Sequence, residues 1–221
     1  MARRKKFTLC PLGGVGVAGV LKFWICFHLL GGTKRFGELQ RLLPQASRQM
    51  LTRQLRELEQ VGMVRRQVFD QLPPKVEYSL TDAGRQSEEL VYQFHAWAQW
   101  CAAAIGMEYD DWLRIHSGAW MVWIWYHLLS GAKRYSDLRR LLPQANDQIL
   151  AARLREMERL GVIYRAPLQD GTSKVAYSLT RLGRTSEPIL RARYAWGRWF
   201  CERVGLEFDW PVGDDVNEMM T

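Results

Sequence analysis

The sequence predicts a mainly helical chain with small antiparallel β-hairpins, in which one domain occurs twice. Three observations lead to this prediction. Residues 32–46 return as residues 131–145 with only conservative changes, 99 positions later. Leucines recur at helical spacing ahead of a glycine, and two short segments typical of strands flank a Pro-Pro pair. At 48% hydrophobic and 24% charged residues, the composition is that of a folded protein, so disorder is not the default expectation.

The repeat extends over nearly the whole chain without a gap. The same shift carries the Tyr-Ser-Leu-Thr segment at 78–81 to 177–180, and it relates the ends of the two copies as well. We therefore expect two domains, residues 1–110 and residues 111–221. Most protein oligomers are two-fold symmetric dimers of identical domains. Two copies of one domain in a single chain therefore indicate an intramolecular pseudo-dimer.

The first helix of each copy is expected at residues 17–30, where an apolar run ends at Gly31 and Gly32. A short helix over residues 35–43 should follow and end at Pro44, which cannot continue it. The first two elements are thus a long apolar helix and a short one, separated by a tight turn.

The third helix begins after Ser47, a favourable N-cap residue. Leu51, Leu55 and Leu58 lie on one face of it, and Gly62 can adopt the left-handed conformation that ends a helix. Together with the preceding helix this arrangement is a helix-turn-helix.

Two strands are expected next, at residues 63–69 and 75–80, joined by a loop around Pro73 and Pro74. Thr81 then caps a final helix that should run to about residue 105. A hairpin in this place is the wing of a winged helix-turn-helix domain.

Burying the leucines of the third helix turns a polar face outward. Arg can pair with guanine and Gln with adenine in the major groove, while Thr offers a methyl group to thymine. Lys and Arg on the neighbouring elements can hold phosphates. The DNA-binding candidates of the first copy are Lys34, Arg35, Ser47, Arg48, Gln49, Thr52, Arg53, Arg56, Arg65, Arg66 and Lys75. The alternative is a solvated basic helix face.

The second copy keeps the inward positions and changes the outward ones. Asp147, Ala151 and Ala152 stand where the first copy has Arg48, Thr52 and Arg53, and Tyr164 replaces Arg65. Gln148 and Arg155 remain as candidates for weaker contact with DNA. We expect the first copy to dominate the affinity.

Both copies resemble the HxlR-type winged helix-turn-helix regulators, a bacterial family. The resemblance rests on the residues at 10–11, 34–39, 47–58, 62–64 and 73–81 with Gly84. It implies a homodimer that binds operator DNA through the third helix and the wing, with the terminal helices forming the interface. It also implies a response to oxidants or electrophiles through a cysteine at the position of Cys10, where the second copy has Tyr109.

The reactivity of Cys10 can also be argued from its neighbours. Basic residues at 3–6 would lower the pKa of its thiol and favour the reactive thiolate. The alternative is an inert, partly buried cysteine packed beside Pro11. The four cysteines show neither a disulfide framework nor zinc-ligand spacing, which predicts a reducing cytoplasm and no metal site.

Two N-terminal patterns suggest other functions, export or cofactor binding, but neither is complete. The basic run at 2–6 followed by apolar residues 7–30 resembles a signal peptide or membrane anchor, but Lys22 interrupts it and no cleavage pattern follows. The Gly-rich segment at 14–19 matches a dinucleotide-binding fingerprint, but no second strand with an acidic end follows it. We expect no cofactor and no membrane, and since no nucleophile has a matching base, no enzyme.

Ten tryptophans are many for 221 residues. The simpler interpretation is an aromatic core and interface between the copies. The alternative is a pocket for a small aromatic effector that includes Trp24, Trp120 and Trp123.

The net charge of +8 suits a polyanionic partner such as nucleic acid. The function predicted is that of a sequence-specific transcriptional regulator that binds double-stranded DNA and responds to a small molecule or to thiol modification. The rival prediction is a ligand-sensing or protein-interaction scaffold that kept the winged fold and lost operator binding.

Overall fold

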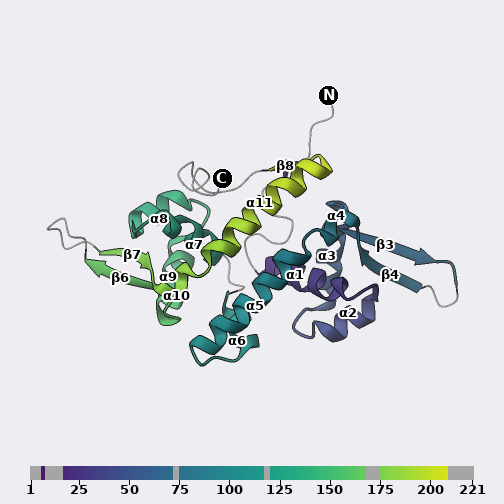
Figure 1. The fold of residues 1–221 in the computed structure, drawn as a ribbon, viewed down its shortest axis with the longest axis horizontal. Coiled ribbons are helices and arrows are strands. Elements are labelled where there is room, and N and C mark those ends of the chain that lie inside the picture. The colour runs from purple at the N-terminus through teal and green to yellow at the C-terminus, as the bar shows by residue number, and fades with distance from the viewer. Residues whose placement is uncertain (1–5, 8–16, 72–74, 117–119, 168–174, 209–221) are drawn as a thin grey trace. The chain divides into compact units, whose positions relative to one another are not determined.

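The computed structural model describes residues 6–7, 17–71, 75–116, 120–167 and 175–208 of the chain (Figure 1). This part is mostly helical, and each repeat adds a three-stranded antiparallel sheet. The predicted fold class, tandem winged helix-turn-helix domains with small β wings, is confirmed. That the two copies pack as an intramolecular pseudo-dimer stays a prediction.

The elements of the first repeat follow the expected order. They are α1 (Val17–Leu30), β2 (Lys34–Arg35), α2 (Phe36–Leu42), α3 (Arg48–Gln60), β3 (Val64–Phe69), β4 (Lys75–Leu80), α4 (Asp82–Arg85) and α5 (Glu88–Ala104), with β1 (Lys6–Phe7) ahead of them.

The second repeat matches this order and adds a helix at its start. Its elements are α6 (Tyr109–His116), α7 (Met121–Leu129), β5 (Lys133–Arg134), α8 (Tyr135–Leu141), α9 (Asp147–Arg159), β6 (Ile163–Pro167), β7 (Val175–Leu179), α10 (Arg181–Arg184), α11 (Glu187–Val204) and β8 (Glu207–Phe208).

Local sequence signals explain the helix-turn-helix. The hydroxyl of Ser47 accepts a hydrogen bond from the backbone N–H of Met50 at 3.2 Å and so caps α3. Gly62 ends that helix with φ at 81°, a conformation that favours glycine. Leu51, Leu55 and Leu58 are at most 1% exposed, as their spacing predicts.

The wing is a sheet of three strands in the order β2-β4-β3, and β3 lies at its edge. Figure 1 shows the β3–β4 hairpin extending away from the helices of its repeat. The sequence prediction was wrong on one point here. Lys34 and Arg35 do not begin a helix, because they pair with Tyr78 and Glu77 of β4 as the short strand β2.

The predicted final helix is also interrupted, between Arg85 and Glu88. Thr81 does cap its start, since the Thr81 hydroxyl accepts a hydrogen bond from the N–H of Gly84 at 3.0 Å. The buried Ser87 hydroxyl, however, donates to the carbonyl oxygen of Gly84 at 2.7 Å. Such local side-chain bonds compete with the helical ladder, and a new helix starts after Ser87.

The described residues form two compact units whose limits differ from the repeats. The first contains residues up to His95 together with residues 196–208, and the second contains residues 96–195. Each unit thus includes the C-terminal part of the other repeat's last helix. In the first unit, Val204 of α11 lies about 4.0 Å from where a Cβ on Gly62 would be. The repeat boundary near residue 110 stays a prediction.

No helix among the described residues is both long and apolar enough to cross a bilayer. The basic and apolar residues 2–16, which suggested a leader, lie outside that part apart from β1.

Candidate functional site

The outward face of α3 forms a shallow hollow of about 640 Å³. Its lining combines base-reading and phosphate-binding side chain types with one carboxylate. The lining residues are Arg48, Gln49, Thr52, Arg53, Arg56, Glu57 and Gln60. The structure therefore brings together, on one surface, the residues that the sequence placed opposite the leucines of α3.

Several cations next to this surface lack a matching negative charge. Arg56 on α3 and Arg65 and Arg66 on β3 are exposed, and within the described part of the chain they form no ion pair. Because their charge is uncompensated, these guanidinium groups are well suited to hold phosphates or base edges.

Arg48 at the start of α3 is fixed by an aromatic ring. Its guanidinium carbon lies 5.3 Å from the ring centroid of Phe36, which begins α2. This cation–π contact keeps the positive charge of Arg48 next to the N-terminus of α3, where backbone N–H groups already favour an anion.

Thr52 uses its hydroxyl within the helix. Its Oγ1 donates to the carbonyl oxygen of Arg48 at 2.8 Å. With the hydroxyl proton used in this way, the methyl group is the part of Thr52 better suited to contact a base, which agrees with the expected contact with thymine.

The two predicted lysine contacts are more constrained than the arginines. The ammonium group of Lys34 donates to the carbonyl oxygens of Gly31 and Gly32, each at 3.3 Å, in the turn after α1. Lys75 lies 2.6 Å from the Glu77 carboxylate. Any phosphate contact by either lysine would therefore compete with an existing partner.

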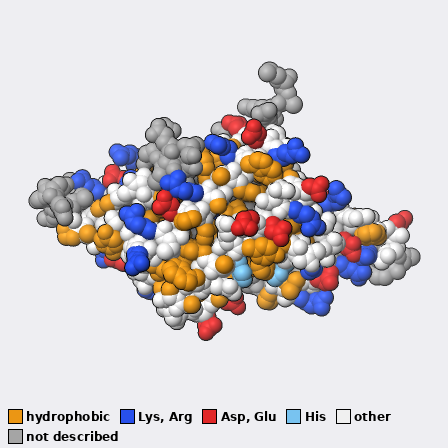
Figure 2. Space-filling model, in the orientation of Figure 1, with side chains coloured by type: hydrophobic (Ala, Val, Ile, Leu, Met, Phe, Trp, Pro, Cys, Tyr) orange, Lys and Arg blue, Asp and Glu red, His pale blue; other side chains and the backbone are white. Residues whose placement is uncertain are grey.

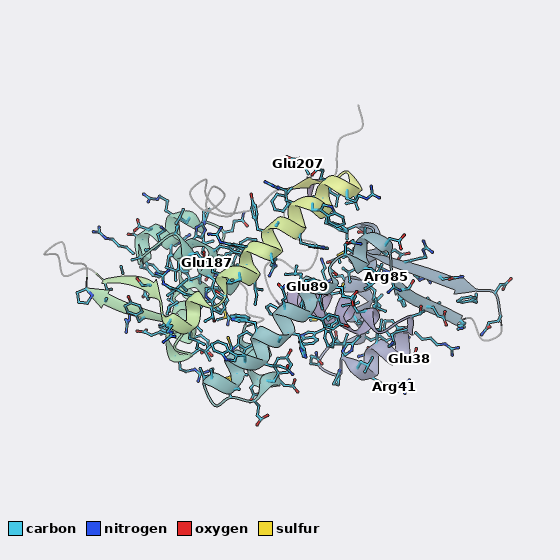
Figure 3. The ribbon with its side chains drawn as sticks, viewed as in Figure 1. Glu38, Arg41, Arg85, Glu89, Glu187 and Glu207 are labelled. Carbon is cyan, nitrogen blue, oxygen red and sulfur yellow. The ribbon has the colours of Figure 1, made fainter. Side chains whose placement is uncertain are left out.

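Arg35 remains exposed, and its backbone N–H donates to Glu38 at 2.6 Å at the start of α2. Figure 3 shows Glu38 and Arg41 on this helix. The bond satisfies an N–H that the start of α2 would otherwise leave unpaired, and so it stabilises the first turn of α2.

The corresponding face of the second repeat is organised differently. Asp147 begins α9 and accepts hydrogen bonds from the Tyr135 hydroxyl at 3.0 Å and from Arg139 Nε at 2.9 Å. An anion therefore occupies the N-terminus of α9, where the first repeat has Arg48. The contacts with Asp147 also raise the pKa of Tyr135, after a larger effect of desolvation.

Other cations of the second repeat are also paired. Arg159 lies 2.8 Å from Glu156, and Arg165, the counterpart of Arg66, lies 2.9 Å from Glu158. Gln148 and Arg155 are exposed, so these two predicted candidates stay accessible. The α9 face thus presents much less uncompensated positive charge than the α3 face.

An aromatic cluster with two histidines lies on α1 and α5 of the first unit. Trp24 packs edge-to-face on Phe27 and His95, with ring centroids 5.2 and 5.6 Å apart. Histidines reach the surface beside hydrophobic side chains on the face drawn in Figure 2. Burial lowers the pKa of His95, and burial followed by the charge of Lys34 lowers that of His28, which favours the neutral form of both.

The three tryptophans suggested for an effector pocket have different surroundings. Trp24 is 8% exposed in the first unit, whereas Trp123 of the second unit is wholly buried and stacks on Tyr126. Trp120 is partly buried and adopts a left-handed backbone conformation before α7. The complete burial of Trp123 agrees with a place in the aromatic core. The effector pocket stays a prediction.

Cys10 lies outside the described residues, whereas Cys26, Cys101 and Cys201 are buried free thiols. Burial raises the pKa of Cys101 to about 12, although a hydrogen bond with Thr185 acts in the opposite direction. We expect iodoacetamide at pH 8 to leave these three thiols unmodified in the folded chain, because burial keeps the reagent from all three and the raised pKa of Cys101 leaves almost no thiolate there.

Peptide mass spectrometry before and after unfolding in guanidinium would check this expectation. Unfolding should expose all three thiols to alkylation within minutes. Rapid labelling of Cys101 in the folded chain would contradict the burial described here, and labelling confined to Cys10 would agree with its predicted reactivity.

Comparison with known proteins identifies a family for both repeats. The sequence profile of the HxlR-like helix-turn-helix family matches residues 17–104 and again residues 115–204. The two matches together cover most of the chain.

Individual relatives agree with this match. The chain is 47% identical over 94 residues to the uncharacterised HTH-type transcriptional regulator YybR of Bacillus subtilis, covering 42% of the chain and 71% of that protein. It is 45% identical over 83 residues to the similar regulator YdeP of the same organism, covering 38% and 65%. The chain thus spans about two thirds of the length of these relatives.

A solved structure of the redox regulator HypR in its oxidised form is 48% identical to this chain, covering 38% of this chain and 87% of that one. The TM-score is 0.36.

Proposed function

The chain belongs to the HxlR-like helix-turn-helix family, whose members matched here are HTH-type transcriptional regulators, and we propose that it binds double-stranded DNA sequence-specifically through its first repeat. The observation that carries this proposal is the α3 face, where Arg, Gln and Thr side chains line one hollow. Side chains of these types at the surface of a recognition helix suit the major groove.

The roles follow from position and charge. Gln49, Thr52, Arg53 and Arg56 read bases, because they lie on the outward face of α3. The remaining contacts hold the DNA backbone. Those contacts come from Lys34, Arg35, Ser47, Arg48, Arg65, Arg66 and Lys75.

The second repeat contributes less to binding. The Asp147 carboxylate neutralises Arg139 at the N-terminus of α9, and Arg159 and Arg165 are each paired with a glutamate, so these groups offer no surplus positive charge to phosphates. This feature favours the rival function, a scaffold that no longer binds DNA, for the second repeat alone. A chain with one strong reading surface would gain affinity by pairing with a second chain.

Two regulatory inputs extend the proposal. A thiol response would depend on Cys10, since the described cysteines are buried. A small aromatic effector would bind near Trp24, where aromatic rings gather and part of the cluster is exposed.

The test is selection of bound duplexes from a random library by the full chain, followed by affinity measurements at several salt concentrations. A DNA reader should enrich a motif. The logarithm of its binding constant should fall linearly with the logarithm of the salt concentration, with a slope of about 0.9 for each phosphate neutralised. A scaffold should enrich no sequence and show little salt dependence, which would refute the proposal.

The second repeat should gain DNA affinity when its reading helix is made to match the first. Asp147→Arg with Ala152→Arg removes the anion at the start of α9, adds two cations and releases Arg139 from its ion pair. We expect the salt slope for non-specific duplex to steepen by about two, or about 0.9 for each new phosphate contact. Fluorescence anisotropy across a salt series would measure it.

The reciprocal change in the first repeat is the matched control. Arg48→Asp should flatten the same slope by about one or more, since a phosphate contact is lost and a repulsive charge gained. An unchanged slope in the Asp147→Arg, Ala152→Arg variant would show that more than these charges keeps α9 from DNA.

A further inference from the structure

One acidic side chain lies among the cations of the reading surface. Glu57 on α3 lines the same hollow as Arg53 and Arg56 and is 37% exposed. A carboxylate directed at DNA is repelled by phosphates unless a nearby cation balances it. An unpaired carboxylate at position 57 would therefore lower the affinity of this surface for DNA.

Lys22 provides that balance from behind the reading helix. Its ammonium nitrogen lies 2.8 Å from Oε2 of Glu57, and its side chain is only 12% exposed. Lys22 belongs to α1, which packs against α3. Because a nearly buried charge is stable only when it is paired, this ion pair fixes the Glu57 carboxylate in one place.

The other carboxylate oxygen of Glu57 faces a base-reading side chain. Oε1 lies 3.8 Å from Nε of Arg53, one helical turn earlier, and Arg53 is 61% exposed. An exposed arginine normally gives up many rotamers when it binds, and a carboxylate next to Nε limits them beforehand. The fork that recognises guanine includes the outer amino groups of a guanidinium, which lie beyond Nε.

We propose that Glu57, held by Lys22, is a positioning residue that orients Arg53 to read a guanine. This inference rests on the proposed function and adds to it a determinant of base preference that does not itself contact the base. Lys22, on the apolar helix α1, acts through Glu57.

The second repeat lacks this arrangement. Met121, which is 1% exposed, occupies the place of Lys22, and Ala152 occupies that of Arg53. The remaining carboxylate, Glu156, pairs with Arg159 at 2.8 Å. The lysine and the arginine are thus both absent from the repeat whose reading surface is otherwise neutralised.

The test measures base preference in the full chain. Anisotropy would compare the duplex selected by the wild-type protein with duplexes in which each guanine is replaced in turn. The guanine that Arg53 contacts is the one whose replacement weakens binding of the wild-type chain but not of Arg53→Ala. At that position the wild-type chain should bind the guanine duplex about 5- to 100-fold more tightly than the replaced one. Glu57→Gln should reduce that preference at least about fivefold while affinity for unrelated duplex stays equal or rises.

Four further variants separate positioning from simple structural support. Lys22→Met should cause the same loss, and Met121 shows that the fold accepts methionine there. Lys22→Arg should keep the preference, since it keeps the charge. Glu57→Gln added to Arg53→Ala should cause no further loss, as expected for coupled residues. Glu156→Gln, the control in the second repeat, should leave the guanine preference unchanged, although release of Arg159 can raise affinity for every duplex.

The outcomes distinguish this inference from the proposed function. If the wild-type chain selects a motif and Glu57→Gln retains its guanine preference, the positioning role is wrong and the proposed function stands. A uniform loss of affinity on every duplex, with a lowered Tm, would likewise overturn the inference, because it would show a purely structural role. If the wild-type chain selects no motif, both the positioning role and the proposed function are wrong.

Discussion

Replacing Arg53 and Arg56 together with alanine should abolish motif selection by the full chain. Both side chains are exposed on the α3 face and line the same hollow. A bidentate Arg–guanine contact contributes about 1–3 kcal/mol of discrimination, so losing two should weaken binding to the preferred duplex roughly a hundredfold or more. Library selection repeated with the Arg53→Ala, Arg56→Ala variant, and anisotropy on the wild-type motif, would measure this.

The matched control is Arg155→Ala, at the position in α9 that corresponds to Arg56. It should change affinity for the motif by less than about threefold, because one phosphate contact at most is removed from a weakly bound surface. An equal loss on all sequences in the Arg53→Ala, Arg56→Ala variant would instead assign both arginines to the phosphate backbone and leave base reading to other side chains.

The reading surface could be predicted because helical periodicity is a local property. Once Leu51, Leu55 and Leu58 are assigned to the core, the side chains half a turn away must face outward. The structure places those leucines at most 1% exposed and gathers the predicted polar side chains around one hollow. Whether these side chains contact DNA stays a prediction that the variants above test.

The partners of the charged groups could not be predicted in the same way. Glu57 lies four residues after Arg53, so that pair could have been found from helical spacing. The pairing of Lys22 with Glu57 joins two helices, and that of Arg139 with Asp147 also joins two. Such pairs depend on how the helices pack, which no local pattern in a single sequence specifies.

Two features of the backbone were missed for a similar reason. A two-residue strand such as β2 exists only because β4 lies beside it. At the break before α5, both the hydroxyl and the backbone N–H of Ser87 donate to the carbonyl oxygen of Gly84, a local pattern that helical periodicity does not reveal. The repeat likewise predicts what elements form, but not that residues 196–208 belong to the same compact unit as the first repeat.

Gly84→Ala should cause a large loss of stability. A Cβ at this position would overlap the carbonyl oxygen of Met63, and its neighbouring carbonyl carbon would lie 3.1 Å away. That oxygen already accepts the backbone N–H of Thr81 at 3.0 Å, where the wing meets α4. Because two backbone segments would have to separate, we expect a loss of about 3 kcal/mol in the free energy of unfolding.

Urea unfolding followed by circular dichroism would measure this loss, and Gly37→Ala is the control. Gly37 is exposed on α2, and an added Cβ there meets no atom within 4 Å, so alanine should stabilise the chain by about 0.5–1 kcal/mol. Gly183→Ala should repeat the loss in the second repeat, since its Cβ would overlap the carbonyl oxygen of Val162. A Gly84→Ala variant as stable as the wild type would show that the wing and α4 do not approach this closely.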